Sequence, residues 1–175
     1  MASNRLNTGA LWLDGAVTSL NVATLPFPGM LGQFYEKDGK KYQLVKVDSS
    51  SNALAANDVV SWIDYDDFVV TNDVSDISGT EANAANQPAG VAVGTGTIGY
   101  YCFIQVRGTA TIRTNQDDDI AAGDVLIVDG NEDGQCNSTA AGTAPINIPL
   151  AVALAADDDT ADTVSGMLIV PLNGA

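Results

Sequence analysis

The chain has 175 residues, of which 46% are hydrophobic and 6% aromatic, and its 22 acidic residues against seven basic ones give a net charge of −15. A folded chain of this length can bury a core without a metal or a disulfide. The acidic balance argues against a nucleic-acid or anionic-membrane partner, because phosphate contacts require clustered Lys and Arg.

The first 32 residues are poorly periodic, and residues 25–32 are too rich in Pro and Gly for a helix or a central strand. We predict an extended arm here. Its apolar side chains are numerous for a solvated tail, so the arm should lie on its own domain or on a neighbouring subunit, and the sequence leaves both alternatives open. These side chains are Leu11, Trp12, Leu13, Leu25, Phe27, Met30 and Leu31.

A hairpin is predicted next, because two strand-like runs at 33–37 and 40–47 are joined by Asp38-Gly39, a dipeptide typical of a type I′ turn. The second run alternates imperfectly, and neither of its faces is cleanly apolar. One face would carry Tyr42, Leu44 and Lys46, and the other Lys41, Gln43, Val45 and Val47. We therefore expect the hairpin to be an edge or interface element.

Residues 58–73 predict one or two strands, with Trp62 as a core or interface anchor. Periodicity is then lost, and the Asn, Ala and Gly content of residues 73–90 predicts a long loop with room for one short helix. Loops of this length are often functional or mobile.

Regular β alternation begins at Gly90, and Gly108 is placed to bend the long strand that follows. One face of that strand would carry Tyr100, Cys102, Ile104 and Val106, the other Tyr101, Phe103, Gln105 and Arg107, and the pattern resumes at Ala110 and Ile112. Residues 121–130 predict a further strand. Residues 146–172 predict two more, separated by the acidic turn at 157–159, with Pro149 and Pro171 at strand ends or edges.

These elements predict an all-β protein: a compact β-sandwich or barrel with an extended amino-terminal arm and a β-hairpin. We divide the chain into an arm and hairpin at 1–48 and a β domain at 49–175. The first part has five bases and four acids, and the second has two bases and eighteen acids. The amino-terminal part is therefore nearly neutral, and the acidic excess lies in the β domain.

Histidine is absent, which removes the commonest general base and the commonest transition-metal ligand. We expect no enzymatic activity, no cofactor and no metal. Cys102 and Cys136 lie far apart without CxxC spacing, so both should be reduced and structural. The sequence contains neither a secretory signal pattern nor an apolar stretch long enough to span a membrane, so we expect synthesis in a cytoplasm.

The stretch 129–134, Asp-Gly-Asn-Glu-Asp-Gly, resembles the opening of a calcium loop. Position 12 of such a loop needs a bidentate Glu but is Ala140, and the preceding residues are strand-like instead of helical, so we interpret the stretch as a turn. The acidic clusters at 64–67, 117–119 and 157–159 are interpreted as solvated surface. Residues 94–99 fit G-x-G-x-x-G, but the strand-like run that follows excludes the helix that a dinucleotide site needs.

Three segments from Ala89 onward carry a family resemblance: Gly90-Val91-Ala92 with Gly99-Tyr100-Tyr101 and the run from Ile104 to Gly108, then 122–126 (Ala-Gly-Asp-Val-Leu), then 150–172. In these phrases the sequence resembles capsid decoration (cement) proteins and related small head proteins of tailed bacteriophages. The resemblance implies a non-enzymatic, mainly β protein, commonly trimeric, that sits on the outer surface of an assembled capsid and reinforces it.

On that resemblance we expect the major capsid protein as partner, a homo-oligomer with a trimer favoured, and a location on the outer surface of the virion. Arm and hairpin residues are the candidate contacts with the capsid or a sister subunit: Arg5, Trp12, Phe27, Tyr35, Lys37, Lys40 and Lys41. An alternative is a phage fibre or tail module that binds carbohydrate or a host surface through an exposed platform of Trp62, Tyr65, Tyr100 and Tyr101. A hydrolase using Asp pairs is the third possibility.

Overall fold

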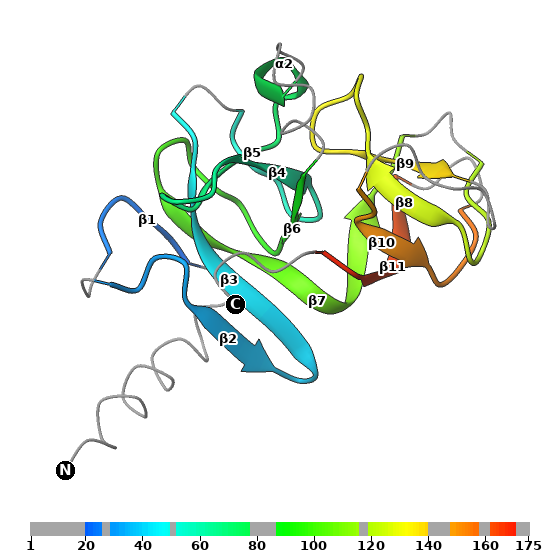
Figure 1. Cartoon of the computed structure of the whole chain (residues 1–175), viewed down its shortest axis with the longest axis horizontal. Coiled ribbons are helices and arrows are strands. Elements are labelled where there is room, and N and C mark those ends of the chain that lie inside the picture. The colour runs from blue at the N-terminus through cyan, green and yellow to red at the C-terminus, as the bar shows by residue number, and fades with distance from the viewer. Residues whose placement is uncertain are drawn as a thin grey trace.

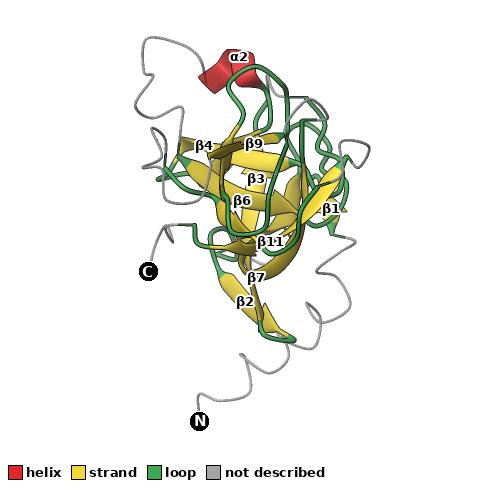
Figure 2. Cartoon of the chain, turned by 90° about the vertical axis from the view of Figure 1, so that its right-hand side faces the viewer, coloured by secondary structure: helices red, strands yellow, loops and turns green. Residues whose placement is uncertain are grey.

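The computed structural model describes residues 20–25, 29–49, 52–77, 87–115, 119–139, 148–157 and 162–170. Within these ranges the protein is almost entirely β, which confirms the predicted fold class (Figure 2). The only helix among the described residues is the single turn α2 (Val74–Ile77). The described residues therefore contain no helix that is long and apolar enough to cross a membrane. The strands are β1 (Asn21–Val22), β2 (Phe34–Lys37), β3 (Lys40–Val47), β4 (Val59–Asp64), β5 (Val69–Thr71), β6 (Pro88–Ala92), β7 (Tyr101–Arg113), β8 (Val125–Val128), β9 (Cys136–Thr139), β10 (Ala151–Ala153) and β11 (Thr163–Leu168).

Five of these strands close into a barrel in the order β3-β5-β4-β6-β7 (Figure 1). The barrel closes because β3 pairs with β5 on one side and with the first half of β7 on the other. All pairs are antiparallel except β3 with β5. Closure leaves no exposed strand edge within these five, which removes the usual template for edge-to-edge aggregation.

The second half of β7 continues out of the barrel and begins a second sheet, ordered β7-β11-β10-β8-β9. The half of β7 that belongs to the barrel and the half that belongs to the second sheet meet at Gly108. This residue pairs with Leu168 of β11 and has a φ of +87°. A positive φ is a conformation that glycine adopts readily, so the bend predicted at this position is confirmed. A bridge between Thr114 and Cys136 brings β9 back towards the end of β7.

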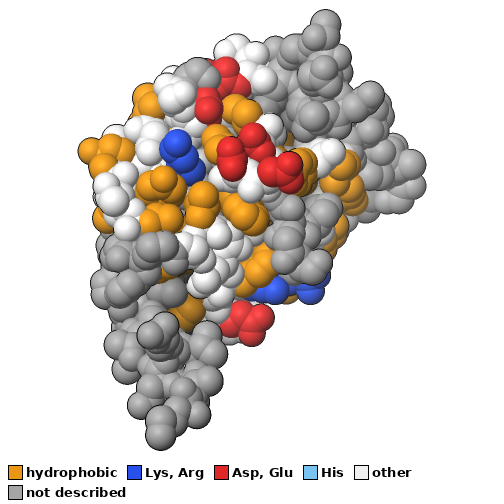
Figure 3. All heavy atoms as spheres, turned by 60° about the vertical axis from the view of Figure 1, so that its left-hand side comes forward, with side chains coloured by type: hydrophobic (Ala, Val, Ile, Leu, Met, Phe, Trp, Pro, Cys, Tyr) orange, Lys and Arg blue, Asp and Glu red, His pale blue; other side chains and the backbone are white. Residues whose placement is uncertain are grey.

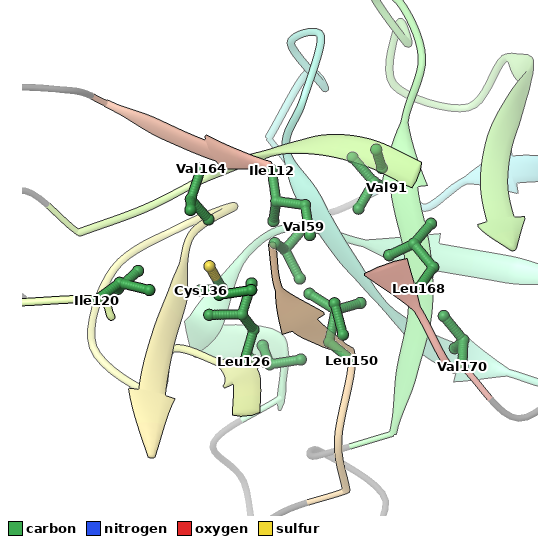
Figure 4. Packing of buried hydrophobic residues seen from close by; sticks show 14 residues of the cluster. Val59, Val91, Ile112, Ile120, Leu126, Cys136, Leu150, Val164, Leu168 and Val170 are labelled. Atoms are coloured by element: carbon green, nitrogen blue, oxygen red, sulfur yellow. The ribbon is translucent and has the colours of Figure 1, made fainter. Parts of the chain in front are cut away.

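Each part of the sheet encloses its own apolar core. Cys102, Ile104 and Val106 of β7 point into the barrel with Val45 and Val47 of β3. Farther along β7, Ala110 and Ile112 join the second core with residues such as Leu126, Leu150 and Val164 (Figure 4). The predicted alternation of β7 is therefore confirmed on both sides of its bend. Like β4 and β6, β7 contributes side chains to both cores.

The predicted hairpin is confirmed, and its turn residues Asp38 and Gly39 have φ values of +52° and +74°, as a type I′ turn requires. The hairpin was expected to be an edge or interface element, and the edge alternative is wrong for β3. That strand is central, since it pairs with β2, β5 and β7. It lacks a clean apolar face because both faces are covered, one by the barrel core and the other by a third cluster that includes Tyr42, Leu44 and Phe103.

The described part of the arm lies on its own domain. Leu20 and Met30 are buried in the third cluster, and Asn21 and Val22 form β1 against the start of β7. The sequence left open whether the arm lies on its own domain or on a neighbouring subunit. Residues 20–25 and 29–32 pack on their own chain. The division into an arm and hairpin at 1–48 and a β domain at 49–175 stays a prediction. The strand before this boundary, β3, is one of the five barrel strands.

Residues 73–90 were predicted to form a long loop with room for one short helix. The helix is present as α2, but residues 88–90 belong to strand β6. The loop was predicted from the Asn, Ala and Gly content of residues 73–90, which does not reveal the strand at their end. Pro88 is the first residue of the strand, a position that tolerates its missing N–H. Gly90 lies against β7, where a β-carbon would come within 2.4 Å of the Gln105 carbonyl oxygen.

Candidate interaction surfaces

Four of the seven basic residues of the chain gather at the tip of the β2–β3 hairpin. Lys37, Lys40, Lys41 and Arg107, together with Glu36, Asp38 and Gly39, line a surface concavity of about 360 Å³, which we call the cationic hairpin site. Figure 3 shows basic side chains together at the lower edge of one face, beside acidic ones. In a chain with a net charge of −15, this is a marked local excess of positive charge.

The strand register places like charges opposite one another in this site. Lys37 pairs with Lys40 across the hairpin, and Lys41 pairs with Arg107 across β3 and β7. Directly opposed like charges destabilise an antiparallel pair. Only one cross-strand partner in the site has the opposite sign, Glu36 opposite Lys41.

Gly108 brings the hairpin tip against β7. A β-carbon at this position would lie 2.9 Å from the Gly39 carbonyl oxygen and 3.2 Å from the Lys40 Cα. The absent side chain therefore lets the turn approach the backbone of β7, with Arg107 next to it. A β-bulge between Lys41 and Tyr42 adjusts the register at the same place.

Aromatic side chains support the base of the hairpin. The Lys41 ammonium lies 4.1 Å from the centroid of the Phe34 ring, a cation–π contact that holds the Lys41 stem against β2. Tyr35 packs partly against the third cluster, and Tyr42 is buried in it. Burial raises the pKa of the Tyr42 phenol, and the Asp38 carboxylate raises it further while Lys37 opposes the change. Tyr42 therefore stays neutral at physiological pH.

A second surface is formed by the outward side chains of the second sheet, which we call the uncharged face. Eight of these side chains are not ionisable: Thr109, Thr111, Val125, Ile127, Val152, Leu154, Ser165 and Met167. Arg113, at the end of β7 opposite Thr163, is a charged exception at the margin, where it pairs with Asp58. Val125, Val152 and Met167 form a continuous row, since Val152 pairs with Val125 on one side and Met167 on the other. Met167 and Leu154 are 40% and 49% exposed, and the neighbouring Ile169 is 47% exposed.

The structure brings together four of the seven predicted contact residues, Tyr35, Lys37, Lys40 and Lys41, on the hairpin. Arg5, Trp12 and Phe27 lie outside the described residues. Sequence reasoning missed Arg107 as a member of the site, and it missed the uncharged face. The available signals were a charged residue, Arg107, directly after the apolar alternation from Cys102 to Val106, and the apolar run at 167–170, which gives β11 hydrophobic residues on both faces.

The stretch at 129–134 is the turn between β8 and β9, as predicted. Asp129 is buried, and its carboxylate accepts hydrogen bonds from the Asn131 backbone N–H at 2.8 Å and the Asn115 amide at 3.2 Å. Among the described residues, no group of three or more acidic or Cys side chains could hold a metal ion. Residues 94–99 lead into β7 instead of a helix.

The two cysteines are buried and not bonded to one another. Burial raises the pKa of the Cys102 thiol to about 12, so this side chain stays protonated and unreactive at neutral pH. Both cysteines belong to apolar cores, Cys102 to the barrel and Cys136 to the second sheet.

Three of the four aromatic residues suggested as a carbohydrate platform, Trp62, Tyr65 and Tyr101, take part in packing, and the fourth, Tyr100, is half-buried. Trp62 is only 3% exposed, inside the barrel core. Tyr65 packs beside it with ring centroids 5.4 Å apart, and burial raises the pKa of Tyr65 to about 12. Tyr101 packs against the third cluster on another part of the barrel. A binding platform needs exposed rings on one surface, and these rings are largely used for packing.

No family model and no curated protein matches this chain. Among solved structures, the chain is similar to the N base of the head fiber gp8.5 of bacteriophage phi29. The identity is 16%, the TM-score is 0.47, and the match covers 73% of this chain and 92% of that chain. A similarity at this level carries no argument about function.

Proposed function

We propose that the protein is a non-enzymatic structural component of a bacteriophage head. In this proposal it binds the assembled shell from outside, contacts the major capsid protein, and stabilises the shell by bridging adjacent capsid subunits. It acts as a homo-oligomer, with a trimer favoured. The sequence resemblance to decoration proteins supports the class of function, and the two surfaces described above support an adhesive role.

The uncharged face is the observation that carries the proposal. Each copy has a net charge of −15, which opposes the approach of two copies, and contact through a surface without acidic groups keeps the closest like charges apart. The outward side chains of β8, β10 and β11 are such a surface, and Met167 and Leu154 expose large apolar groups on it. An apolar centre with few charges is characteristic of stable protein interfaces.

Stabilisation of a shell in this way requires no chemistry. Apolar burial contributes on the order of 25 cal/mol per Å² before the cost of association is subtracted. A decoration protein repeats the same contact at many positions, and an oligomer engages several of them at once. The individual contacts can therefore be weak, because simultaneous engagement raises the overall affinity.

Charge placed on the uncharged face should abolish self-association. We expect the double variant Met167→Glu/Leu154→Glu to have the mass of one chain in analytical ultracentrifugation. The two exposed apolar side chains proposed to contact another copy would then be acidic, in a molecule whose net charge is already −15. Ile63→Glu is the matched control, since Ile63 is 43% exposed on β4, a strand of the barrel. An unchanged oligomer in the double variant, or a wild-type chain that is monomeric, would rule out this face as the contact between copies.

A further inference from the structure

We infer that the cationic hairpin site binds a short carboxylate-rich segment of a partner protein. The site comprises Lys37, Lys40, Lys41 and Arg107 around the concavity of about 360 Å³. This inference names the chemistry of a ligand and does not depend on the capsid proposal, because an acidic segment is recognised by the same groups whichever protein carries it.

Unfavourable pairing in the isolated chain is the first argument. In the strand register Lys37 faces Lys40, and Lys41 faces Arg107 on one side and Glu36 on the other, so two of these three cross-strand pairs join like charges. Opposed like charges cost stability in a sheet. Places where a sequence violates such a local rule are expected to be functional sites, and an anionic ligand would convert both repulsive pairs into attractive contacts.

Protection of a strand edge is the ordinary explanation for surface lysines, and it does not account for this site. Lysine on an edge strand discourages pairing with other chains, which suits Lys37 on β2. Arg107, however, lies on β7, where it is paired with Lys41 of β3, and the pairing of β7 with β11 starts at the next residue, Gly108, opposite Leu168. It has no open edge to protect, yet the approach of the hairpin to Gly108 brings it beside the lysines.

The basic residues outside the site are placed differently. Arg113 forms an ion pair with the buried Asp58, with 3.2 Å between the guanidinium nitrogen and the carboxylate oxygen. Lys46 lies at the other end of β3. The concentration of positive charge is therefore specific to the hairpin tip among the described residues.

Charge and size favour a few carboxylates over nucleic acid. Glu36 and Asp38 line the same concavity, so four bases and two acids leave the site with a charge of only +2. The remainder of the chain is strongly acidic and would repel the continuous phosphate backbone of DNA or RNA. A concavity of about 360 Å³ accommodates a few side chains, and Arg with Lys can hold them by charge-assisted hydrogen bonds.

Binding of a fluorescent, amino-terminally acetylated hexaglutamate peptide to the full chain at low ionic strength tests the inference by fluorescence anisotropy. We expect saturable binding that weakens with salt. The double variant Lys40→Glu/Arg107→Glu should bind about tenfold more weakly or worse, and Lys40→Gln/Arg107→Gln should fall between it and the wild type. Lys46→Glu, the same change elsewhere on β3, should bind like the wild type. Circular dichroism and the denaturation midpoint establish that each variant is folded.

Three results would overturn the inference: no binding by the wild-type chain, equal weakening by Lys46→Glu, or tighter binding of a single-stranded oligothymidylate than of the peptide. The assay contains no capsid, so its outcome is separable from the proposed function. A chain that binds shells but ignores the peptide would refute only the carboxylate site. A chain that binds the peptide but ignores shells would refute only the role on the capsid.

Discussion

Replacing Gly90 with alanine is expected to lower the free energy of unfolding by about 4 kcal/mol, combining overpacking with backbone strain. Gly90 has a φ of +153°, and an added β-carbon would lie 2.4 Å from the Gln105 carbonyl oxygen. That oxygen belongs to the backbone of β7, which is paired on both sides, so it cannot move aside as a flexible side chain could. Either β6 separates from β7 or the barrel deforms.

Gly130→Ala is the control for this prediction. A β-carbon at Gly130 meets nothing within 4 Å, and its φ is outside the left-handed range. Urea denaturation of both variants measures the difference, and Gly130→Ala should remain within about 0.5 kcal/mol of the wild type. If the two variants were equally stable, the close approach of β6 to β7 would be disproved.

Removing the Asp58 carboxylate is expected to destabilise the protein by about 3 kcal/mol, because several donors would lose their acceptor in a buried place. Asp58 is 1% exposed, and its carboxylate accepts hydrogen bonds from the Ala55 backbone N–H at 2.8 Å and the Asn72 amide at 3.0 Å. It also pairs with Arg113 at the end of β7. Gly134, in the turn of the second sheet, lies directly against it. Asp58 thus connects the barrel to the second sheet.

Thermal or urea denaturation of Asp58→Ala should be compared with Asp66→Ala, which removes the same charge from an exposed turn. The control separates the local hydrogen bonds from the general relief of charge repulsion in an acidic protein. Asp66→Ala should be neutral or slightly stabilising. Equal stability of the two variants would show that the buried carboxylate does not hold the two sheets together.

Local patterns were sufficient to predict most of the strands. Asp38-Gly39 specifies its turn through backbone conformations that few residues adopt, and the alternation from Cys102 to Val106 reports which side chains face a core. Gly108 marked the bend between two alternating runs. Each of these signals depends only on neighbouring residues in the sequence, so it can be recognised without knowledge of the tertiary structure.

Pairing between distant strands could not be predicted. The barrel closes because β3 pairs with β7, whose partners Lys41 and Arg107 are far apart in the sequence. The same contact converts β3 from an apparent edge strand into a central one. The start of β6 was missed for a related reason, since the composition of residues 73–90 indicates a loop unless the positions of β4 and β7 on either side of Pro88 and Gly90 are known.

The candidate surfaces were only partly predictable for the same reason. The lysines of the hairpin are adjacent in sequence and were recognised as a contact region, whereas Arg107 joins them only through the fold. The uncharged face combines side chains from four strands, none of which stands out alone. Alternation shows that Met167 points away from Leu168, but only the sheet order shows that Val152 and Val125 lie beside it.

Co-sedimentation of the purified chain with expanded phage shells that lack it, with the solution mass of the free chain measured in parallel, tests the central claim of an adhesive protein most directly. The account predicts an oligomer that pellets with the shells, saturates at a fixed number of copies per shell and raises their resistance to heat. A chain that remains a monomer in solution, stays in the supernatant and leaves shell stability unchanged would contradict it.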